Sequence, residues 1–183
     1  MTPFTSAYLP PVEWYAAMVA SGCHDLDRRC RYSRQRNVNR CTILMPDGPQ
    51  TLTIPLVAES THATVGDLRI SDHGRWRAHH WNALQTAYGK SPFFEYYADD
   101  FRPFYTDHWT CLADFNEALH ATVCRLLDIT TLPRPNTAQA PVAIQPYYQV
   151  FMQRIGFKPG MSIVDLLFNM GPEGIFILLG REL

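Results

Sequence analysis

Hydrophobic residues recur at helical spacing in several stretches of the chain. The clearest stretch runs from 110 to 127 and predicts an amphipathic helix. Its apolar stripe consists of Leu112, Phe115, Leu119, Val123 and Leu126. Similar patterns predict helices over 72–88 and 92–105. A further helix is expected over 12–20, where prolines precede it and Gly22 ends it.

The segment from Ser162 to Pro172 predicts another short helix. Ser162, with Asp165 three residues later, is typical of a capping box, and Gly171 followed by Pro172 is typical of a helix end. Nearly every residue between them is large and apolar, so we expect this helix to be buried on most sides. On this interpretation, the carboxylate of Asp165 caps the helix rather than taking part in catalysis.

Between the first helix and the later ones, the pattern predicts strands. Two apolar runs, 41–45 and 51–57, flank Pro46-Asp47-Gly48-Pro49, which indicates a β-hairpin near 42–57. A short strand is expected near 67–70. Because strands and helices do not alternate, we expect an α+β fold with a small antiparallel sheet packed by several helices. The 183 residues are expected to form a single domain, 1–183, with a Pro-rich loop at about 130–146.

Composition narrows the classes of function. The formal net charge of -1 gives no general attraction to nucleic acid. No apolar run approaches the roughly 20 residues that span a bilayer, and the first residues do not resemble a signal peptide. The five cysteines form no CxxC pair, so we expect buried free thiols in a reducing compartment and a cytoplasmic protein.

Sequence motifs for metals and cofactors are missing. The histidines and cysteines show no zinc-binding spacing, so no metal site is predicted. The chain contains no GxGxxG, Walker A, GxSxG or HExxH motif, and its cofactor, if it has one, stays unassigned. The oligomeric state is equally open.

The predicted helix over 72–88 carries the candidate catalytic residue, His80. On a helical wheel His80 shares an apolar face with Trp76, whereas His79 lies on the polar face. A buried imidazole needs hydrogen-bond partners, and near neutral pH it can act as a general base. The alternative is a core histidine with a structural role, and the residues alone leave both open.

A second group of candidate residues precedes the hairpin and comprises Gln35, Asn39 and Arg40. An arginine can bind both oxygens of a carboxylate or a phosphate, and the neighbouring amides can bind sugar hydroxyls. The alternative is a solvated polar loop. Asn116, at the edge of the apolar stripe over 110–127, is expected to make structural hydrogen bonds with the backbone.

Four segments together resemble the WbqC-like protein family. They are Ala7–Val12; Gln35 with Asn39 and Arg40 before a hairpin; the stretch from Trp76 through His80-Trp81 to Tyr97; and the stretch from Tyr148 to Pro172. The chain departs from the family pattern at Val38, where an arginine is usual. On this resemblance we expect His80 to be catalytic. The residues expected to bind substrate are Gln35, Asn39, Arg40, Trp76 and Trp81.

Members of that family occur with genes for surface-polysaccharide synthesis of the O-antigen type, and transfer of glycine onto an amino sugar has been suggested. The resemblance therefore implies a transferase for a small molecule, an amino sugar or nucleotide sugar, with His80 as general base. The alternative is a non-catalytic module that binds a glycan or another pathway enzyme through aromatic residues. A pocket that contains both His80 and Arg40 favours the enzyme, whereas a flat aromatic surface favours the module.

Overall fold

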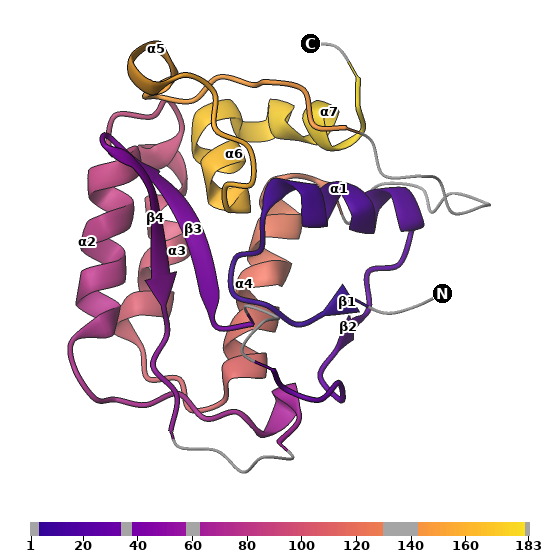
Figure 1. Cartoon of the computed structure of the whole chain (residues 1–183), viewed down its shortest axis with the longest axis vertical. Helices are drawn as coiled ribbons and strands as arrows, with labels where there is room; N and C mark the ends of the chain where they lie inside the picture. The colour runs from indigo at the N-terminus through magenta and orange to yellow at the C-terminus, as the bar shows by residue number, and fades with distance from the viewer. Residues whose placement is uncertain (1–3, 34–37, 58–62, 130–142, 182–183) are drawn as a thin grey trace.

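The computed structural model describes residues 4–33, 38–57, 63–129 and 143–181. Helices dominate, and two small strand pairs accompany them (Figure 1), which confirms the α+β class. The helices are α1 (Val12–Ser21), α2 (Trp76–Tyr88), α3 (Phe94–Thr106), α4 (Leu112–Leu126), α5 (Met152–Ile155), α6 (Ile163–Met170) and α7 (Gly174–Leu178). The strands are β1 (Phe4–Thr5), β2 (Leu26–Asp27), β3 (Arg40–Met45) and β4 (Gly48–Thr53).

Strands β3 and β4 form the expected hairpin, with a tighter turn than the sequence indicated. Met45 pairs with Gly48, so only Pro46 and Asp47 form the turn, while Arg40 pairs with Thr53 at the open end. Strands β1 and β2 form a separate parallel pair near the N-terminus.

The strand expected near 67–70 does not form. The chain instead makes a 3-10 turn at Val65–Asp67, followed by isolated bridges from Arg69 to Cys111 and from Ile70 to Leu56. The reason is local, because the Asp67 carboxylate accepts hydrogen bonds from the backbone and hydroxyl of Thr64. Such capping interactions favour a helical turn over an extended chain.

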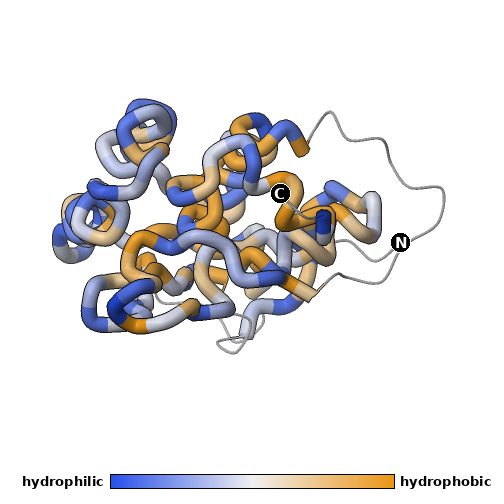
Figure 2. The backbone as a smooth tube through the Cα atoms, turned by 90° about the horizontal axis from the view of Figure 1, so that it is seen from above, coloured by the Kyte–Doolittle hydropathy of each residue, from blue (hydrophilic) through white to orange (hydrophobic). Residues whose placement is uncertain are grey.

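The helices pack around one hydrophobic core. Four residues of the predicted stripe of α4, Leu112, Phe115, Leu119 and Val123, are inaccessible to solvent, whereas Leu126 is half-buried. Helix α1 ends at Gly22, whose φ of 65° is left-handed, as expected for a glycine that closes a helix. Figure 2 shows hydrophobic segments gathered where the elements meet.

Helix α6 is buried along its whole length, as expected, but its capping box does not form. Ser162 is the N-cap residue, and its hydroxyl donates to the Leu9 carbonyl, 2.9 Å away. The backbone N–H of Ser162 donates to Thr42, so Asp165 has no cap donor to accept from. The Asp165 carboxylate turns into the core and accepts a hydrogen bond from Tyr147, 2.7 Å away. The capping interpretation of Asp165 was therefore wrong, because tertiary donors replace the local one.

The expectation of buried free thiols is met for four of the five cysteines. All five are free, and only Cys30 is half-buried. No helix in the described part of the chain is both long and apolar enough to cross a membrane. Most of the loop expected at 130–146 lies outside the described residues, and 143–146 form neither helix nor strand.

Candidate functional site

His80 points from α2 into the core, as the helical wheel predicted, and only 4% of it is exposed. Trp76, one turn earlier on the same face, packs edge-on against the imidazole with ring centroids 5.2 Å apart. The ring of Tyr8 stacks on the imidazole with centroids 5.7 Å apart. His79 is exposed, as expected.

The imidazole of His80 is hydrogen-bonded to protein groups. The Tyr8 hydroxyl lies 3.0 Å from Nδ1 of His80 and 2.9 Å from the Tyr105 hydroxyl. A further hydrogen bond joins His80 to the backbone of Thr53. Burial disfavours the imidazolium and lowers the pKa of His80 from 6.5 to about 4, although the bond to Thr53 opposes this shift. His80 is therefore neutral near pH 7, and its Nδ1 can accept a hydrogen bond from the Tyr8 hydroxyl.

Cys41 extends this cluster. Its side chain is buried beside Tyr8, and burial raises the pKa of the thiol well above its ordinary value, although Tyr8 opposes this shift. The neighbouring Arg40 does not counteract this shift, because successive side chains of a strand point to opposite faces. Cys41 is consequently protonated at neutral pH and is not a thiolate nucleophile.

Arg40 lies at the mouth of a pocket of about 250 Å³. The pocket is lined by Pro11, Arg40, Cys41, Thr42, Thr51, Gly160 and Ser162. Thr42 and Thr51 are paired across the hairpin. Arg40 is exposed and makes no ion pair or side-chain hydrogen bond with any residue in the described ranges. An unpaired guanidinium among hydroxyl groups can bind a carboxylate or a phosphate.

The other candidate binding residues lie elsewhere. Gln35 falls outside the described residues. Asn39 is buried, and its amide donates to the Ile54 carbonyl, 2.8 Å away, which holds the open end of the hairpin. Trp76 is buried beside His80, and Trp81 is half-buried against Phe94 and Tyr105. Asn39, Trp76 and Trp81 do not line the Arg40 pocket.

His80 and Arg40 meet the same hairpin but do not share one cavity. His80 contacts the backbone of Thr53, which is the residue paired with Arg40. His80 does not line the pocket. Cys41 also lines the pocket, but its side chain is buried beside Tyr8, on the face of β3 opposite to that of Arg40. The His80 cluster and the Arg40 pocket therefore lie on two faces of the same strand.

Several residues of this site were not among the candidates from sequence, namely Tyr8, Cys41, Thr42, Thr51, Tyr105 and Ser162. Tyr8 comes from the segment before α1, which runs beside the hairpin end (Figure 1), and its N–H donates to Val38. Ser162 is joined to Leu9 and Thr42 by hydrogen bonds. For Tyr8, the sequence signal was its position within the Ala7–Val12 segment used for the family resemblance.

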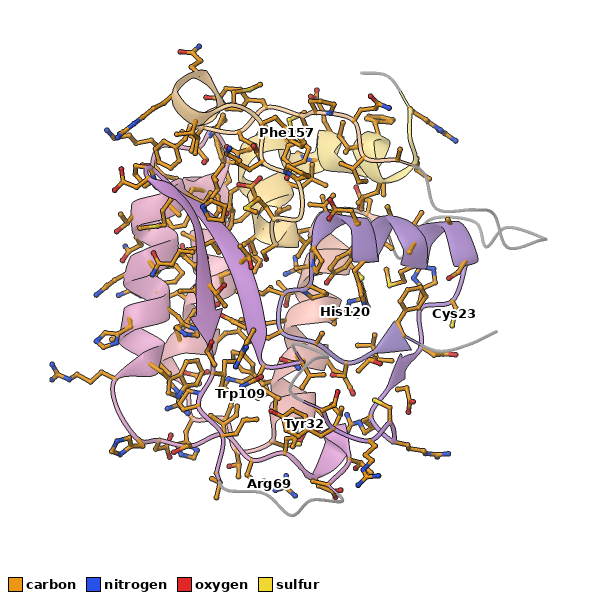
Figure 3. The ribbon with its side chains drawn as sticks, in the orientation of Figure 1. Cys23, Tyr32, Arg69, Trp109, His120 and Phe157 are labelled. Carbon is orange, nitrogen blue, oxygen red and sulfur yellow. The ribbon has the colours of Figure 1, made fainter. Side chains whose placement is uncertain are left out.

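A second histidine cluster lies under α1, where Figure 3 labels His120. Nδ1 of His120 is 3.1 Å from the Tyr15 hydroxyl, and Nε2 is 3.4 Å from the Cys124 thiol. Burial lowers the pKa of His120 to about 4. In the described part of the chain, no three His, Cys, Asp or Glu side chains are grouped so that they could hold a metal ion.

The model of the WbqC-like protein family matches residues 6–137. This range covers most of the chain and includes Tyr8, Arg40, Cys41 and His80. The chain therefore belongs to the WbqC-like protein family. The match ends before Tyr148, so the last of the four segments that carried the resemblance lies outside it. No curated protein and no solved structure matches the chain.

Proposed function

We propose that this WbqC-like protein is a cytoplasmic transferase in the synthesis of bacterial surface polysaccharide of the O-antigen type. Its substrate is an amino sugar or nucleotide sugar, and the reaction is acyl transfer, of which aminoacyl (glycine) transfer is one form. The observation that carries the proposal is Arg40, a guanidinium without a partner among the described residues, at a pocket lined by the threonines Thr42 and Thr51. Family membership supplies the biological context.

In this proposal Arg40 binds the anionic group of the substrate, a carboxylate or a phosphate, and Thr42 and Thr51 donate hydroxyl hydrogen bonds to it. Gln35 assists from the preceding segment. Asn39 positions Arg40 indirectly, because its amide holds the open end of the hairpin. Trp76 packs against His80 and Trp81 packs against Tyr105, so the two tryptophans affect the substrate indirectly, by holding the His80 cluster in place.

His80 serves as the general base through a relay. When the amine of the acceptor attacks the acyl carbon, its proton passes to the Tyr8 oxygen. Tyr8 gives its own hydroxyl proton to Nδ1 of His80, 3.0 Å away, so Tyr8 ends neutral and His80 ends protonated. The lowered pKa keeps the imidazole neutral at pH 7 but makes His80 a weaker base than an ordinary histidine, so the imidazolium forms only during the transfer. The leaving group of the donor departs with the electron pair of the broken acyl bond.

Binding is tested by thermal-shift screening with nucleotide sugars and aminoacyl donors on the wild type, Arg40→Ala and Arg102→Ala. Arg102 is a matched control, since it is also exposed and has no ion pair among the described residues. A ligand at a hundred times its Kd stabilises a protein by about 2.7 kcal/mol. We expect this stabilisation in the wild type and in Arg102→Ala but not in Arg40→Ala. Equal shifts in all three proteins would contradict the proposal.

Catalysis is tested with Tyr8→Phe and Tyr105→Phe. Both remove one buried hydroxyl of the same cluster, but only Tyr8 bonds to Nδ1 of His80. We expect Tyr8→Phe to abolish turnover with ligand binding retained, while Tyr105→Phe stays active. If Tyr8→Phe and Tyr105→Phe have equal turnover, then His80 has a structural role and is not the general base.

The second candidate function is a non-catalytic glycan-binding module. Tyr96 on α3 is 77% exposed, and the rings of Tyr96 and Tyr97 have centroids 6.2 Å and 6.4 Å from that of Phe93. Such exposed aromatic faces can stack on sugar rings. Tyr96→Ala, compared with Arg40→Ala in binding to immobilised polysaccharide, separates the two functions. A loss confined to Tyr96→Ala supports the module.

A further inference from the structure

The segment 147–160, which we call the strap, connects the Arg40 pocket to the core of the protein. It contains α5 and lies over α6, with Phe157 labelled on it in Figure 3. The rings of Tyr147 and Phe157 pack edge-on with centroids 5.2 Å apart, which joins the two ends of the strap. Gly160, the last residue of the strap, lines the pocket.

Asp165 of α6 holds the strap in place. Its Oδ2 accepts hydrogen bonds from the Tyr147 hydroxyl at 2.7 Å and from the Gln149 amide at 2.8 Å. The side chain of Gln149 also bonds to both the N–H and the carbonyl of Lys158. One carboxylate therefore anchors the beginning of the strap directly and Lys158 through Gln149, while the N–H of Gly160 donates to the carboxylate of Glu13 on α1.

The charge of Asp165 has no cation to balance it among the described residues. The carboxylate is inaccessible to solvent. Its neighbours are Tyr147 and Gln149 from the strap, Tyr88 from α2 and Asn169 from α6 itself. The two tyrosines are the titratable groups that face it, and both are neutral near pH 7 because burial raises the pKa of each. Only neutral hydrogen-bond donors thus stabilise a fully buried anion.

We propose that ionisation of Asp165 controls how firmly the strap closes over the Arg40 pocket. The effect on ligand binding rests on the proposed function, whereas the movement of the strap does not. An ionised Asp165 is costly to bury without a cation, and opening the strap returns it to water. A protonated Asp165 is buried at lower cost, so acidification closes the strap and alkalinisation loosens it.

The pH range follows from linkage. Burial raises the pKa of Asp165 from 3.8 to about 6, while hydrogen bonds from Tyr147, Gln149 and Tyr88 oppose the shift. With the strap open, the exposed carboxyl returns to its ordinary pKa of about 3.9. The opening equilibrium then rises about tenfold between pH 5 and pH 7.5.

Hydrogen exchange of the full-length protein without ligand tests the strap directly. The probes are the hydrogen-bonded amides of Arg154, Gly156 and Lys158. After correction for intrinsic exchange, we expect them to open about tenfold more at pH 7.5 than at pH 5 in the wild type. Asp165→Asn should remove this pH dependence, and Asp99→Asn, which replaces an exposed carboxyl on α3, should retain it.

A second variant keeps the test decisive if Asp165→Asn does not fold. Tyr147→Phe removes one hydrogen bond to the ionised carboxyl, so the midpoint of the pH dependence should move to higher pH, which a merely loosened contact would not cause. Unchanged pH dependence in both variants would overturn the proposal.

Ligand binding separates this inference from the proposed function. UDP serves as the probe, and we expect its affinity for the wild type to fall as pH rises from 5 to 7.5, but not for Asp165→Asn. If UDP binds both proteins with an affinity that does not depend on pH, then Asp165 does not control ligand binding in the pocket. If UDP binds neither protein while exchange depends on Asp165, UDP is no ligand and the strap mechanism stands.

Discussion

The hydroxyl of Tyr8 lies 3.0 Å from Nδ1 of His80, although 72 positions separate the two residues. This buried hydrogen bond fixes the segment before α1 to the apolar face of α2. It also places the imidazole in a buried polar cluster with the hydroxyls of Tyr8 and Tyr105. The bond serves both stability and the proposed chemistry, and variants of His80 test the first of these.

Replacing His80 with alanine should destabilise the protein. The change leaves a cavity beside Trp76 and removes the acceptor of the Tyr8 hydroxyl, which together cost about 2–4 kcal/mol. Urea unfolding measures the loss. His79→Ala, an exposed neighbour on the same helix, should change the free energy of unfolding by less than about 0.5 kcal/mol. A wild-type unfolding curve for His80→Ala would contradict the packing described here.

Acidification should destabilise the protein through its buried histidines. The folded-state pKa values of His80 and His120 are lowered to about 4, so the unfolded chain binds protons first as the pH falls. Stability present above pH 6.5 is lost toward pH 4, by roughly 3 kcal/mol for His80 alone. The pKa of Asp165 is raised to about 6, so protonation of this carboxyl stabilises the folded protein as the pH falls. The two histidines together outweigh this single group, and the net effect of acidification is a loss of stability.

The contribution of His120 can be isolated by His120→Gln, which keeps a hydrogen-bond acceptor for Tyr15 but cannot titrate. Urea unfolding at pH 7 and pH 5 should show a smaller loss of stability in this variant than in the wild type. His79→Gln controls for removal of an exposed histidine. An identical loss in His120→Gln and the wild type would mean that His120 is not buried in its neutral form.

Gly171→Ala should strongly destabilise the end of α6. An added Cβ would lie 2.6 Å from the ring of Phe93, and the φ of 56° disfavours any other residue. Overpacking and backbone strain together cost about 2–4 kcal/mol. Gly74→Ala is a matched control, since its φ of 78° is also left-handed but nothing lies within 4 Å. We expect only the strain, about 1 kcal/mol, in that control.

Thiol labelling of the native protein should be selective. Cys30 is half-buried, whereas Cys41 and Cys124 are buried and burial raises the pKa of both thiols, that of Cys124 to about 12. Alkylation followed by peptide mass spectrometry should therefore find Cys30 modified well before Cys41 or Cys124. Rapid labelling of Cys41 would show that solvent reaches the cluster around Tyr8.

Rules that depend only on neighbouring residues were sufficient to predict the main helices. The periodic apolar residues of α4, the glycine that ends α1 and the apolar face of α2 each depend on residues close in sequence. The same rules misassigned Asp165, whose spacing from Ser162 matches a capping box. Its carboxylate instead accepts hydrogen bonds from Tyr147 and Gln149. These two residues belong to another segment, and tertiary packing decides their position.

Local spacing and residue type were enough to predict that His80 faces inward, that a hairpin follows Arg40, and that the chain resembles the WbqC-like family. The pocket that Arg40 shares with Ser162 and Gly160 rather than with His80, and the contact of Tyr8 with His80, depend on tertiary packing. Contacts between residues so far apart form when apolar burial brings whole elements together, and no local pattern encodes which polar groups then meet.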